Sequence, residues 1–421
     1  MGLNYEKNFL HMEGVNVKEL ASEFITPFYC YSKKVLLANY GELKKALPRA
    51  EICYAVKANS NMAIVKLLAE QGCGADVTSR GELMLALKCG IPAEKIVFNG
   101  VGKTINALTL AMQYGVKQIN IESEEELDTI NQIGIKTLTR ANIGIRINPD
   151  VDAKTNKKIT TGKAENKFGV AWPEALRLYK KAFQMNGVMI KGISIHIGSQ
   201  IMSLKPFEQA FKKLAKWIDQ LEKEHIIIKN IDLGGGLGVV YNYKKDKAVA
   251  AKDYAKLIDT YFKRFKKNII VEPGRRLVAN AGVLVSKVLY NKNIGSKKIL
   301  VIDAGMNDFM RPALYHDAWH EILPCIKWNR PVNKVDIVGD VCESSDIFGR
   351  ERLLPELKRG EFVAIMGAGA YGSSMSSIYN YHPLAPEVLV EGKVFRVIRR
   401  RKTYEEMLDE QLDDIKYGLK K

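Results

Sequence analysis

Glu51-Ile52-Cys53-Tyr54-Ala55-Val56-Lys57-Ala58-Asn59-Ser60 is a largely apolar, strand-like stretch that carries a single lysine near its end. Burying an ammonium group is costly unless its pKa falls or the amine forms a covalent bond. A lysine that forms a Schiff base avoids this cost and gains a reaction. The alternative is a lysine at a strand end that extends to solvent. The rest of the chain favours the reactive lysine.

Length and composition indicate a soluble globular protein of two or three domains. The chain has 421 residues, of which 47% are hydrophobic and 26% are charged. No run reaches the roughly 18 uninterrupted apolar residues of a membrane span. The first ten residues contain no apolar signal core, so no export is expected.

Cysteine spacing and charge exclude several classes of function. Without a CxxC pair or a framework spacing, the cysteines indicate reduced thiols of a cytoplasmic protein, and no metal site is predicted. The net charge of +17 comes from lysines spread along the whole chain. This distribution argues against nucleic-acid binding, although it would favour an anionic substrate or cofactor. The six cysteines are Cys30, Cys53, Cys73, Cys89, Cys325 and Cys342.

Strand-like and helix-like segments alternate regularly from about residue 50 to residue 275. Strict alternation builds a parallel sheet, and eight such units predict a (β/α)8 TIM-like barrel with its active site at the carboxyl ends of the strands. The predicted strands are Ile52–Ala58, Gly74–Thr78, Lys95–Asn99, Gln118–Glu122, Ile143–Asn148, Gly192–Ile197, Lys229–Leu233 and Asn268–Glu272. The predicted helices are Met62–Gln71, Gly81–Lys88, Thr104–Tyr114, Glu124–Ile133, Pro173–Met185, Pro206–Glu224 and Tyr254–Lys266.

The pattern changes after residue 285, where β-rich runs follow one another without regular helices between them. We therefore predict a barrel domain over residues 30–283 and a β-rich domain over residues 284–421. Residues 1–29 are short and strand-like, so we expect them to join the second domain. The charged tail from Arg399 to Lys421 has helical spacing and predicts a surface helix. The predicted strands of the second domain are Gly282–Tyr290, Lys298–Asp303, Val335–Gly339, Phe362–Met366 and Glu387–Arg396.

Polar groups stand at the ends of the predicted barrel strands, where a site at the barrel mouth needs them. Each alone is weak evidence, because a single strand histidine or glycine turn is usually structural. Together they occupy equivalent positions. They are Lys57, Asp76, Arg146, His196, Gly234-Gly235-Gly236 and Glu272-Pro273-Gly274-Arg275.

This combination describes a site for pyridoxal 5'-phosphate. Glycines after the seventh and eighth strands lie where barrels commonly bind phosphate through backbone N–H groups. Lys57 would supply the amine, and Glu272 would pair with the pyridine nitrogen. A carboxylate keeps that nitrogen protonated, which makes the ring a strong electron sink and suits decarboxylation. An arginine there would weaken the sink and suit racemisation.

A set of motifs over nearly the whole chain resembles the barrel-type, alanine-racemase-like decarboxylases, and among them the diaminopimelate decarboxylase family. The motifs are Tyr54-Ala55-Val56-Lys57-Ala58-Asn59, Thr161-Gly162 with Asn166-Lys167-Phe168-Gly169, His196-Ile197-Gly198-Ser199-Gln200, Gly234-Gly235-Gly236, Glu272-Pro273-Gly274-Arg275, Arg311-Pro312-Ala313-Leu314-Tyr315, Cys342-Glu343-Ser344 with Asp346, and Gly369-Ala370-Tyr371-Gly372.

The resemblance implies a role for each matching residue. Lys57, His196 and Cys342 would be catalytic, His196 would stack on the cofactor ring, and Asp76 would orient His196. Cys342 and Glu343 would reach in from the neighbouring subunit of a homodimer with shared active sites. The implied cofactor-binding residues are Lys57, Asp76, Arg146, His196, Ser199, Gly235, Gly236, Glu272, Gly274 and Tyr371.

The expected reaction is decarboxylation of meso-2,6-diaminopimelate to L-lysine and CO2, the last step of lysine biosynthesis. This substrate ends in both an ammonium and a carboxylate, so its site needs cations and an anion together. Related barrel decarboxylases of ornithine, arginine or carboxynorspermidine are the nearest alternative, and a non-catalytic binding protein is another. The implied substrate-binding residues are Arg275, Arg311, Tyr315, Glu343 and Tyr371.

Two of these residues have a simpler interpretation. Arg311 could be an ordinary surface partner in an ion pair. Cys342 could be an inert buried thiol, because free cysteines often act as small hydrophobic residues. Its position beside Glu343, in a loop rich in small and acidic residues, favours a functional role.

Overall fold

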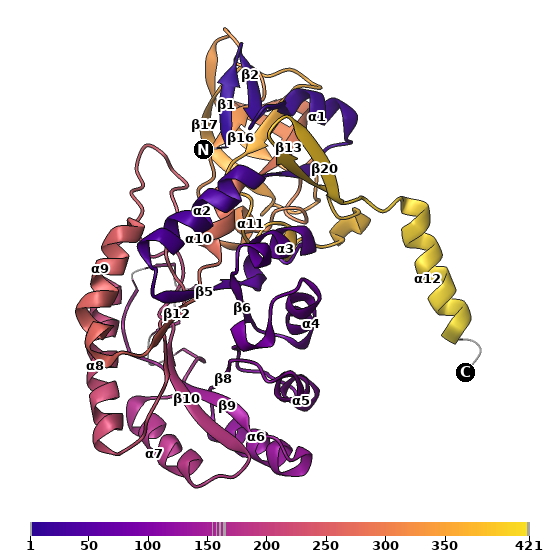
Figure 1. Ribbon diagram of the computed structural model, residues 1–421. Helices are drawn as coiled ribbons and strands as arrows, with labels where there is room; N and C mark the ends of the chain where they lie inside the picture. The colour runs from indigo at the N-terminus through magenta and orange to yellow at the C-terminus, as the bar shows by residue number, and fades with distance from the viewer. Residues whose placement is uncertain (1, 154, 157, 160, 163–165, 419–421) are drawn as a thin grey trace. The chain divides into compact units, whose positions relative to one another are not determined.

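The structure is a computed structural model that describes residues 2–153, 155, 156, 158, 159, 161, 162 and 166–418 (Figure 1). The chain divides into two compact units. The barrel unit comprises Leu37–Val240 and Lys245–Leu277, and the β unit comprises Met1–Leu36, Tyr241–Lys244 and Val278–Lys421. Among the described residues, no helix combines the length and apolar character needed to cross a membrane.

The barrel unit contains a closed parallel barrel, which confirms the predicted fold class. Its strands follow the order β10-β11-β12-β5-β6-β7-β8-β9. All eight predicted strands are present, and each ends one to three residues before its predicted limit. Asp76 and Arg146 are each the last residue but one of their strands, and the other predicted polar groups follow the strands. The strands are β5 (Ala50–Ala55), β6 (Gly74–Val77), β7 (Ile96–Phe98), β8 (Gln118–Ile121), β9 (Ala141–Ile147), β10 (Val188–Ile195), β11 (Asn230–Asp232) and β12 (Asn268–Val271).

Helices connect the barrel strands as the sequence predicts. They are α3 (Met62–Glu70), α4 (Arg80–Lys88), α5 (Ile105–Tyr114), α6 (Glu124–Thr137), α7 (Trp172–Phe183), α8 (Lys205–Lys223) and α9 (Ala251–Phe262). Two further helices, α2 (Lys33–Ala46) and α10 (Arg275–Val278), lie at the limits of the unit.

Matching caps fix two of the turns that lead from strand to helix at the barrel mouth. Ser79 accepts a hydrogen bond from the backbone of Glu82, at 3.1 Å, and begins α4. Ser123 does the same for Glu126, at 3.2 Å, and begins α6. Each glutamate also accepts from a backbone N–H just before the cap. These reciprocal bonds satisfy helix N–H groups that otherwise lack partners, and they hold the ends of β6 and β8.

The β unit is built on a sheet of β17-β16-β14-β13-β4-β19-β20, to which β15 and β18 are added. The N-terminal segment joins this unit through β4, which pairs antiparallel with β13 and parallel with β19. The strands are β4 (Phe28–Ser32), β13 (Gly282–Ile294), β14 (Lys297–Ile302), β15 (Ile322–Pro324), β16 (Val332–Val338), β17 (Ile347–Pro355), β18 (Phe362–Ile365), β19 (Glu387–Glu391) and β20 (Val394–Arg399).

The predicted limits of the barrel domain, residues 30 and 283, fall inside β4 and β13. Both strands belong wholly to the β unit, because they pair with each other through Tyr31 and Gly282. The single strand predicted over residues 387–396 is in fact the hairpin β19–β20. Its turn contains Gly392 at a φ of 62°, a conformation that glycine adopts readily.

The N-terminal segment contains a helix that the sequence interpretation missed. A small sheet of β1 (Leu3–Glu6), β2 (Phe9–Met12) and β3 (Val15–Asn16) leads into α1 (Val17–Glu23). Asn16 caps α1 by accepting from the backbone of Lys18, at 3.0 Å. The remaining helices are α11 (Arg311–Leu314) and α12 (Tyr404–Gly418), which confirms the predicted helix in the tail; residues 419–421 lie outside the described part of the chain.

Candidate active site

Lys57 lies in the 3-10 turn η1 (Val56–Ala58), directly after β5. Its Nζ donates to Oδ2 of Asp76 at 2.5 Å, although the lysine side chain is 41% exposed. Asp76, at 1% exposure, is buried in β6. The amine therefore reaches solvent at one side and a buried carboxylate at the other, which is a suitable position for a reactive lysine.

Asn99, which the sequence interpretation did not select, joins two of the predicted site carboxylates. Its Nδ2 donates to Oδ1 of Asp76 at 2.8 Å and to Oε1 of Glu272 at 2.6 Å. It follows directly after β7, at the strand end where a site residue is expected. Its place at a strand end was the signal that could have identified it.

Glu272 is a buried carboxyl at the end of β12. Burial raises its pKa well above the usual range, and the nearby carboxylates of Asp232 and Asp76 raise it further. Lys57 and the hydrogen bond from Asn99 act in the opposite direction. A buried carboxylate with like-charged neighbours gains most from a positively charged partner, so Glu272 is placed to stabilise a protonated ring nitrogen.

The glycine triplet forms a turn after β11 that only glycine fits. Gly234 and Gly236 have φ values of 64° and 106°. A Cβ on Gly235 would lie 2.3 Å from the carbonyl oxygen of Glu272, which is an impossible overlap. Without side chains, the backbone of this turn can approach a phosphate closely.

His196 follows β10 and is held by the glycine turn. Its Nδ1 accepts from the backbone N–H of Gly235 at 3.1 Å. Burial lowers the pKa of the imidazole, and the cations of Arg146 and Lys57 lower it further. The ring is therefore neutral, which suits stacking on an aromatic cofactor.

The expected contact between Asp76 and His196 is not found among the described hydrogen bonds. Both oxygens of Asp76 accept from Lys57 and Asn99, and Nδ1 of His196 accepts from Gly235. The glycine turn orients the imidazole in place of Asp76.

Arg146, on β9, pairs with Glu122, a carboxylate that the sequence interpretation did not select. Its Nη1 lies 3.0 Å from Oε1 of Glu122, and its guanidinium lies 4.8 Å from the ring centroid of Phe168. Glu122 also accepts from the backbone of Gly169 at 2.8 Å. Arg146 is thus fixed beside the site, as a residue near the cofactor ring needs to be.

Arg275 and Ser199, predicted for different ligands, contact each other. Nη2 of Arg275 donates to the hydroxyl of Ser199 at 3.0 Å, and Nε does so at 3.3 Å. Gly274 precedes Arg275, and a Cβ there would lie 3.0 Å from the Cβ atoms of Ala55 and Ala58. The start of α10 therefore packs directly on the turn that carries Lys57.

The β unit contains the other predicted residues. Arg311 is buried, at 5% exposure, which excludes the simple surface ion pair. Its Nε donates to Nε2 of His320 at 3.3 Å, and its guanidinium lies 4.9 Å from the ring centroid of Tyr241 and 5.6 Å from that of Tyr315. Tyr241 and His320 were not selected from the sequence, because neither belongs to a recognised motif.

Cys342 and Glu343 lie on an exposed loop of the β unit, so Cys342 is not the inert buried thiol of the simpler interpretation. Asp346 fixes this loop: its two carboxylate oxygens accept from the backbones of Met306, at 2.8 Å, and Val341, at 2.9 Å. Tyr371, the remaining predicted residue, is partly buried in the same unit, with a φ of 54°.

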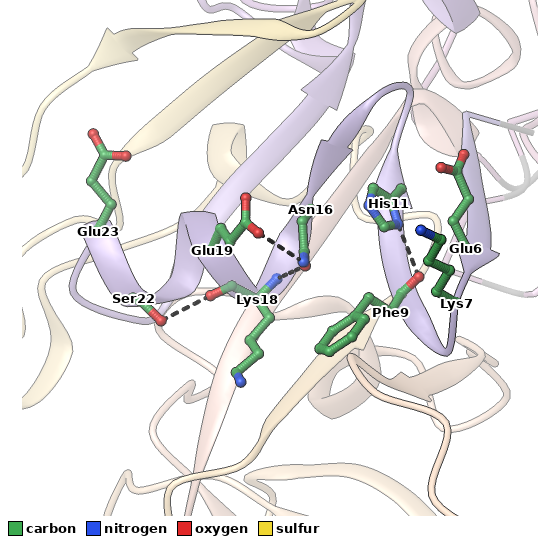
Figure 2. A pocket seen from close by; sticks show the side chains of 9 residues that line it. All are labelled: Glu6, Lys7, Phe9, His11, Asn16, Lys18, Glu19, Ser22 and Glu23. Carbon is green, nitrogen blue, oxygen red and sulfur yellow. Dashed lines mark hydrogen bonds between the residues drawn. The ribbon is translucent and has the colours of Figure 1, made fainter.

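A cavity of about 850 Å³ beside β1, β2 and α1 is separate from the predicted site residues (Figure 2). Some of its polar groups bond to one another; for example, His11 Nδ1 lies 3.0 Å from the carbonyl oxygen of Phe9. None of its lining residues is one of the predicted site residues. The lining residues are Glu6, Lys7, Phe9, His11, Asn16, Lys18, Glu19, Ser22 and Glu23.

The residues at the barrel mouth fit pyridoxal phosphate. Lys57 offers an amine beside a buried carboxylate, the glycine turn has no side chains to keep a phosphate from its backbone, and Glu272 offers a carboxylate for a ring nitrogen. These residues would hold the cofactor, and the cofactor would withdraw electrons from the reacting carbon.

Known proteins agree with this chemistry. The model of the pyridoxal-binding domain of pyridoxal-dependent decarboxylases matches residues 34–279. The diaminopimelate decarboxylase of Aquifex aeolicus is 45% identical over 411 residues, which cover 98% of this chain and 97% of that protein. The crystal structure of diaminopimelate decarboxylase from Helicobacter pylori complexed with L-lysine is 41% identical, covers 95% of this chain and 100% of that chain, and has a TM-score of 0.91.

A further solved structure, the diaminopimelate decarboxylase of M. jannaschii in co-complex with L-lysine, is 38% identical. It covers 97% of each chain, with a TM-score of 0.92. These similarities confirm the cofactor and the class of enzyme, a pyridoxal-phosphate-dependent carboxy-lyase. The chain therefore belongs to the diaminopimelate decarboxylase family of pyridoxal-dependent decarboxylases.

Proposed function

We propose that this chain decarboxylates meso-2,6-diaminopimelate to L-lysine and CO2, the last step of lysine biosynthesis. The observation that carries the proposal is the arrangement of Lys57, Asp76 and Glu272 at the barrel mouth in a chain with near full-length diaminopimelate decarboxylase relatives. The L-lysine bound in the H. pylori and M. jannaschii relatives is the product that this reaction would release.

The barrel residues divide the work of the reaction. When bound, the cofactor withdraws the electron pair that remains as CO2 leaves. Lys57 would hold the cofactor through its amine. Glu272 would keep the ring nitrogen protonated, and the neutral imidazole of His196 would lie against the ring. The buried His196 would also help to exclude water from the departing carboxylate, which favours its loss as neutral CO2.

Further residues are assigned to the substrate and to the final proton. Arg275, Arg311 and Tyr315 bind the distal carboxylate, since a guanidinium offers a carboxylate two parallel donors. Glu343 binds the distal ammonium. Tyr371 contacts the phosphate and the substrate. Cys342 or Lys57 returns a proton to the carbon that lost CO2.

The active form in this proposal is a homodimer in the cytoplasm. Exposure of Cys342 and Glu343 supports the dimer, because both side chains are accessible to a neighbouring subunit. A cytoplasmic location is supported by the five buried cysteines, all free thiols in the described structure. Sedimentation or light scattering tests the dimer, and a monomeric active enzyme would contradict it.

The function is tested by measuring CO2 and lysine release from the purified holoenzyme with meso-diaminopimelate, ornithine, arginine and carboxynorspermidine in parallel. We expect turnover with diaminopimelate alone. Turnover of ornithine or arginine, which lack a distal carboxylate, would overturn the roles of Arg275 and Arg311. A matched variant, Arg311→Lys, keeps the charge but loses the fork, so KM for diaminopimelate should rise roughly tenfold to a hundredfold.

A further inference from the structure

A continuous series of side-chain amides begins at an exposed residue at the start of β12, runs through four buried residues of the barrel and ends at the site carboxylates. We call it the amide spine. Each member donates a hydrogen bond from its NH2 group to the carbonyl oxygen of the next, over distances of 2.7–3.2 Å. In order from the far end to the mouth, the members are Asn268, Asn230, Gln118, Asn120 and Asn99.

The direction of the spine is fixed by its end at the mouth. The carboxylate of Asp76 is paired with the ammonium of Lys57 and offers only acceptors, so the NH2 group of Asn99 must face it, and the same nitrogen lies 2.6 Å from Glu272. The carbonyl oxygen of Asn99 is then an acceptor, and Asn120 donates to it at 2.8 Å. The same reasoning passes to each amide in turn. All five amide dipoles therefore point their positive ends toward the carboxylates.

A third buried carboxylate is attached to the same spine. Asn120 also donates to Oδ2 of Asp232 at 2.7 Å, and the other oxygen of Asp232 accepts from the backbone of Gly234 at 3.0 Å. Asp232 is fully buried and also accepts from the hydroxyl of Ser194 at 3.0 Å. The spine thus connects the acidic end of the site to the glycine turn.

The surrounding strands are shaped for these side chains. A Cβ on Gly192 of β10 would lie 2.2 Å from Oε1 of Gln118. A Cβ on Gly144 of β9 would lie 2.5 Å from Oδ1 of Asn120. Two strand glycines therefore leave the space that the spine occupies, in a position where an apolar residue would normally pack.

The electrostatic problem at the mouth explains what the spine does. Glu272 faces the carboxylates of Asp76 and Asp232, the ammonium of Lys57 and the thiol of Cys53. Three buried carboxyl groups repel one another, so burial alone would protonate one of them. Aligned donors oppose this, because hydrogen bonds to the charged form stabilise it and successive amides polarise one another.

We propose that the amide spine holds Glu272 in position and keeps its carboxylate charged for the ring nitrogen of the cofactor, with Asn99 as the positioning residue at its end. This inference rests on the proposed role of Glu272. It assigns a function to residues in the barrel interior that never touch the substrate.

The first test is made on the cofactor-free protein, by carbon-13 NMR of selectively labelled glutamate carboxyl groups. The Glu272→Gln variant assigns the Glu272 signal. In Asn99→Leu, which has a similar size but donates no hydrogen bond, we expect the titration midpoint of Glu272 to rise by about one pH unit or more. An unchanged midpoint would overturn the inference. Asn142→Leu is the matched control, since its amide donates to the carbonyl oxygen of Val116 at 3.1 Å.

The second test uses the holoenzyme. In Asn99→Leu we expect kcat to fall roughly tenfold to a hundredfold, with little change in KM, and the acid side of the pH–rate profile to move to higher pH. The visible absorbance of the bound cofactor should change its pH dependence in the same direction. A loss of activity with the pH profile unchanged would indicate a merely structural role.

One further variant, Asn99→Ser, and the kinetics of Glu272→Gln keep the outcomes distinct. If Asn99→Leu fails to fold, Asn99→Ser retains a single donor in a space that water can fill, and an intermediate shift is expected; no shift would overturn the inference. If Glu272→Gln leaves kcat and absorbance intact, the proposed role of Glu272 is wrong. If Glu272→Gln is impaired and Asn99→Leu behaves like the parent enzyme, only the role of the spine is wrong.

Discussion

The barrel mouth and the loop of Cys342 solve the problem of placing reactive groups in different ways. At the mouth, Asp76, His196 and Glu272 have their properties set by burial and by one another. The loop exposes Cys342 and Glu343 and is fixed through the backbone by Asp346. Chemistry and packing are therefore inseparable at the mouth, whereas on the loop they can be changed independently.

The largest effect is expected at Lys57, where the comparison can be tested most severely. Lys57→Ala removes the amine that attaches the cofactor, so turnover and the visible absorbance of the bound cofactor should both be lost. Lys117→Ala is the control, because Lys117 also pairs with a barrel carboxylate, Glu51 at 2.9 Å, away from the site residues. Activity in Lys57→Ala would remove the basis of the assigned site.

The glycine turn tests whether the mouth tolerates any added atom. The Cβ in Gly235→Ala would overlap the carbonyl oxygen of Glu272, so the turn must shift. We expect affinity for pyridoxal phosphate to fall roughly a hundredfold, since displacements of this kind commonly cost that much. Fluorescence titration of the cofactor measures it. Gly102→Ala, where an added Cβ meets open space, should bind normally, and equal binding by both variants would contradict the role of the turn.

A pair of cysteine variants sharpens the contrast between exposed and buried groups. Cys342→Ser weakens the proposed proton donor, so kcat should fall roughly a hundredfold while stability changes by less than about 0.5 kcal/mol. Cys30→Ser, in the buried strand β4, should cost about 1–3 kcal/mol of stability and leave kcat unchanged. Steady-state kinetics and urea unfolding of both variants measure these effects. A stability loss in Cys342→Ser would contradict the view that chemistry and packing are independent on the loop.

The last expected effect is on the pH dependence of stability and concerns Asp308 in the β unit. Burial raises the pKa of this carboxyl to about 7, and Asp340 and Asp303 also raise it, whereas the Gly305 N–H and Arg401 lower it. Because the folded pKa lies above the unfolded value, the stabilising contribution is complete below about pH 4 and is lost as the pH rises through about 7.

The measurement is urea unfolding at pH 5 and pH 8. The contribution of Asp308 should fall by about 2–3 kcal/mol between these values, and Asp308→Asn should remove that part of the dependence. Asp409→Asn, on exposed α12, serves as the control. Identical pH dependence in Asp308→Asn and the parent protein would show that the buried carboxyl is not the source.

The sequence predicts the barrel well because alternation and strand apolarity are local signals. It places the strand ends one to three residues late, because a residue such as Lys57 continues an apolar run in sequence but follows the strand in the structure, whereas Asp76 and Arg146 lie inside β6 and β9. The helix α1 was missed because seven residues give too short a periodic pattern. The hairpin β19–β20 was missed for a similar reason, since its turn is marked only by Gly392.

Site residues that stand in a motif were predictable from the sequence. Contacts between residues that are distant in sequence were less so. Asn99 and Asp232 lie at strand ends but have common structural explanations, so their contacts with Glu272 and Gly234 needed coordinates. The orientation of His196 by Gly235 rather than Asp76 depends on a backbone N–H, which no side-chain pattern encodes.

The two glycines beside the amide spine restrict how this protein can drift in sequence. A Cβ on Gly192 would overlap Gln118 and would also lie 2.9 Å from the backbone oxygen of Asn230, and a Cβ on Gly144 would lie 2.5 Å from both Asn120 and Gln118. A side chain at either strand position therefore requires at least a change on β8, and that change would interrupt the row of dipoles. Strand positions that touch no ligand are thus constrained by the acidic groups at the mouth. A barrel redesigned with a hydrophobic interior would have to replace the spine amides and the two glycines together.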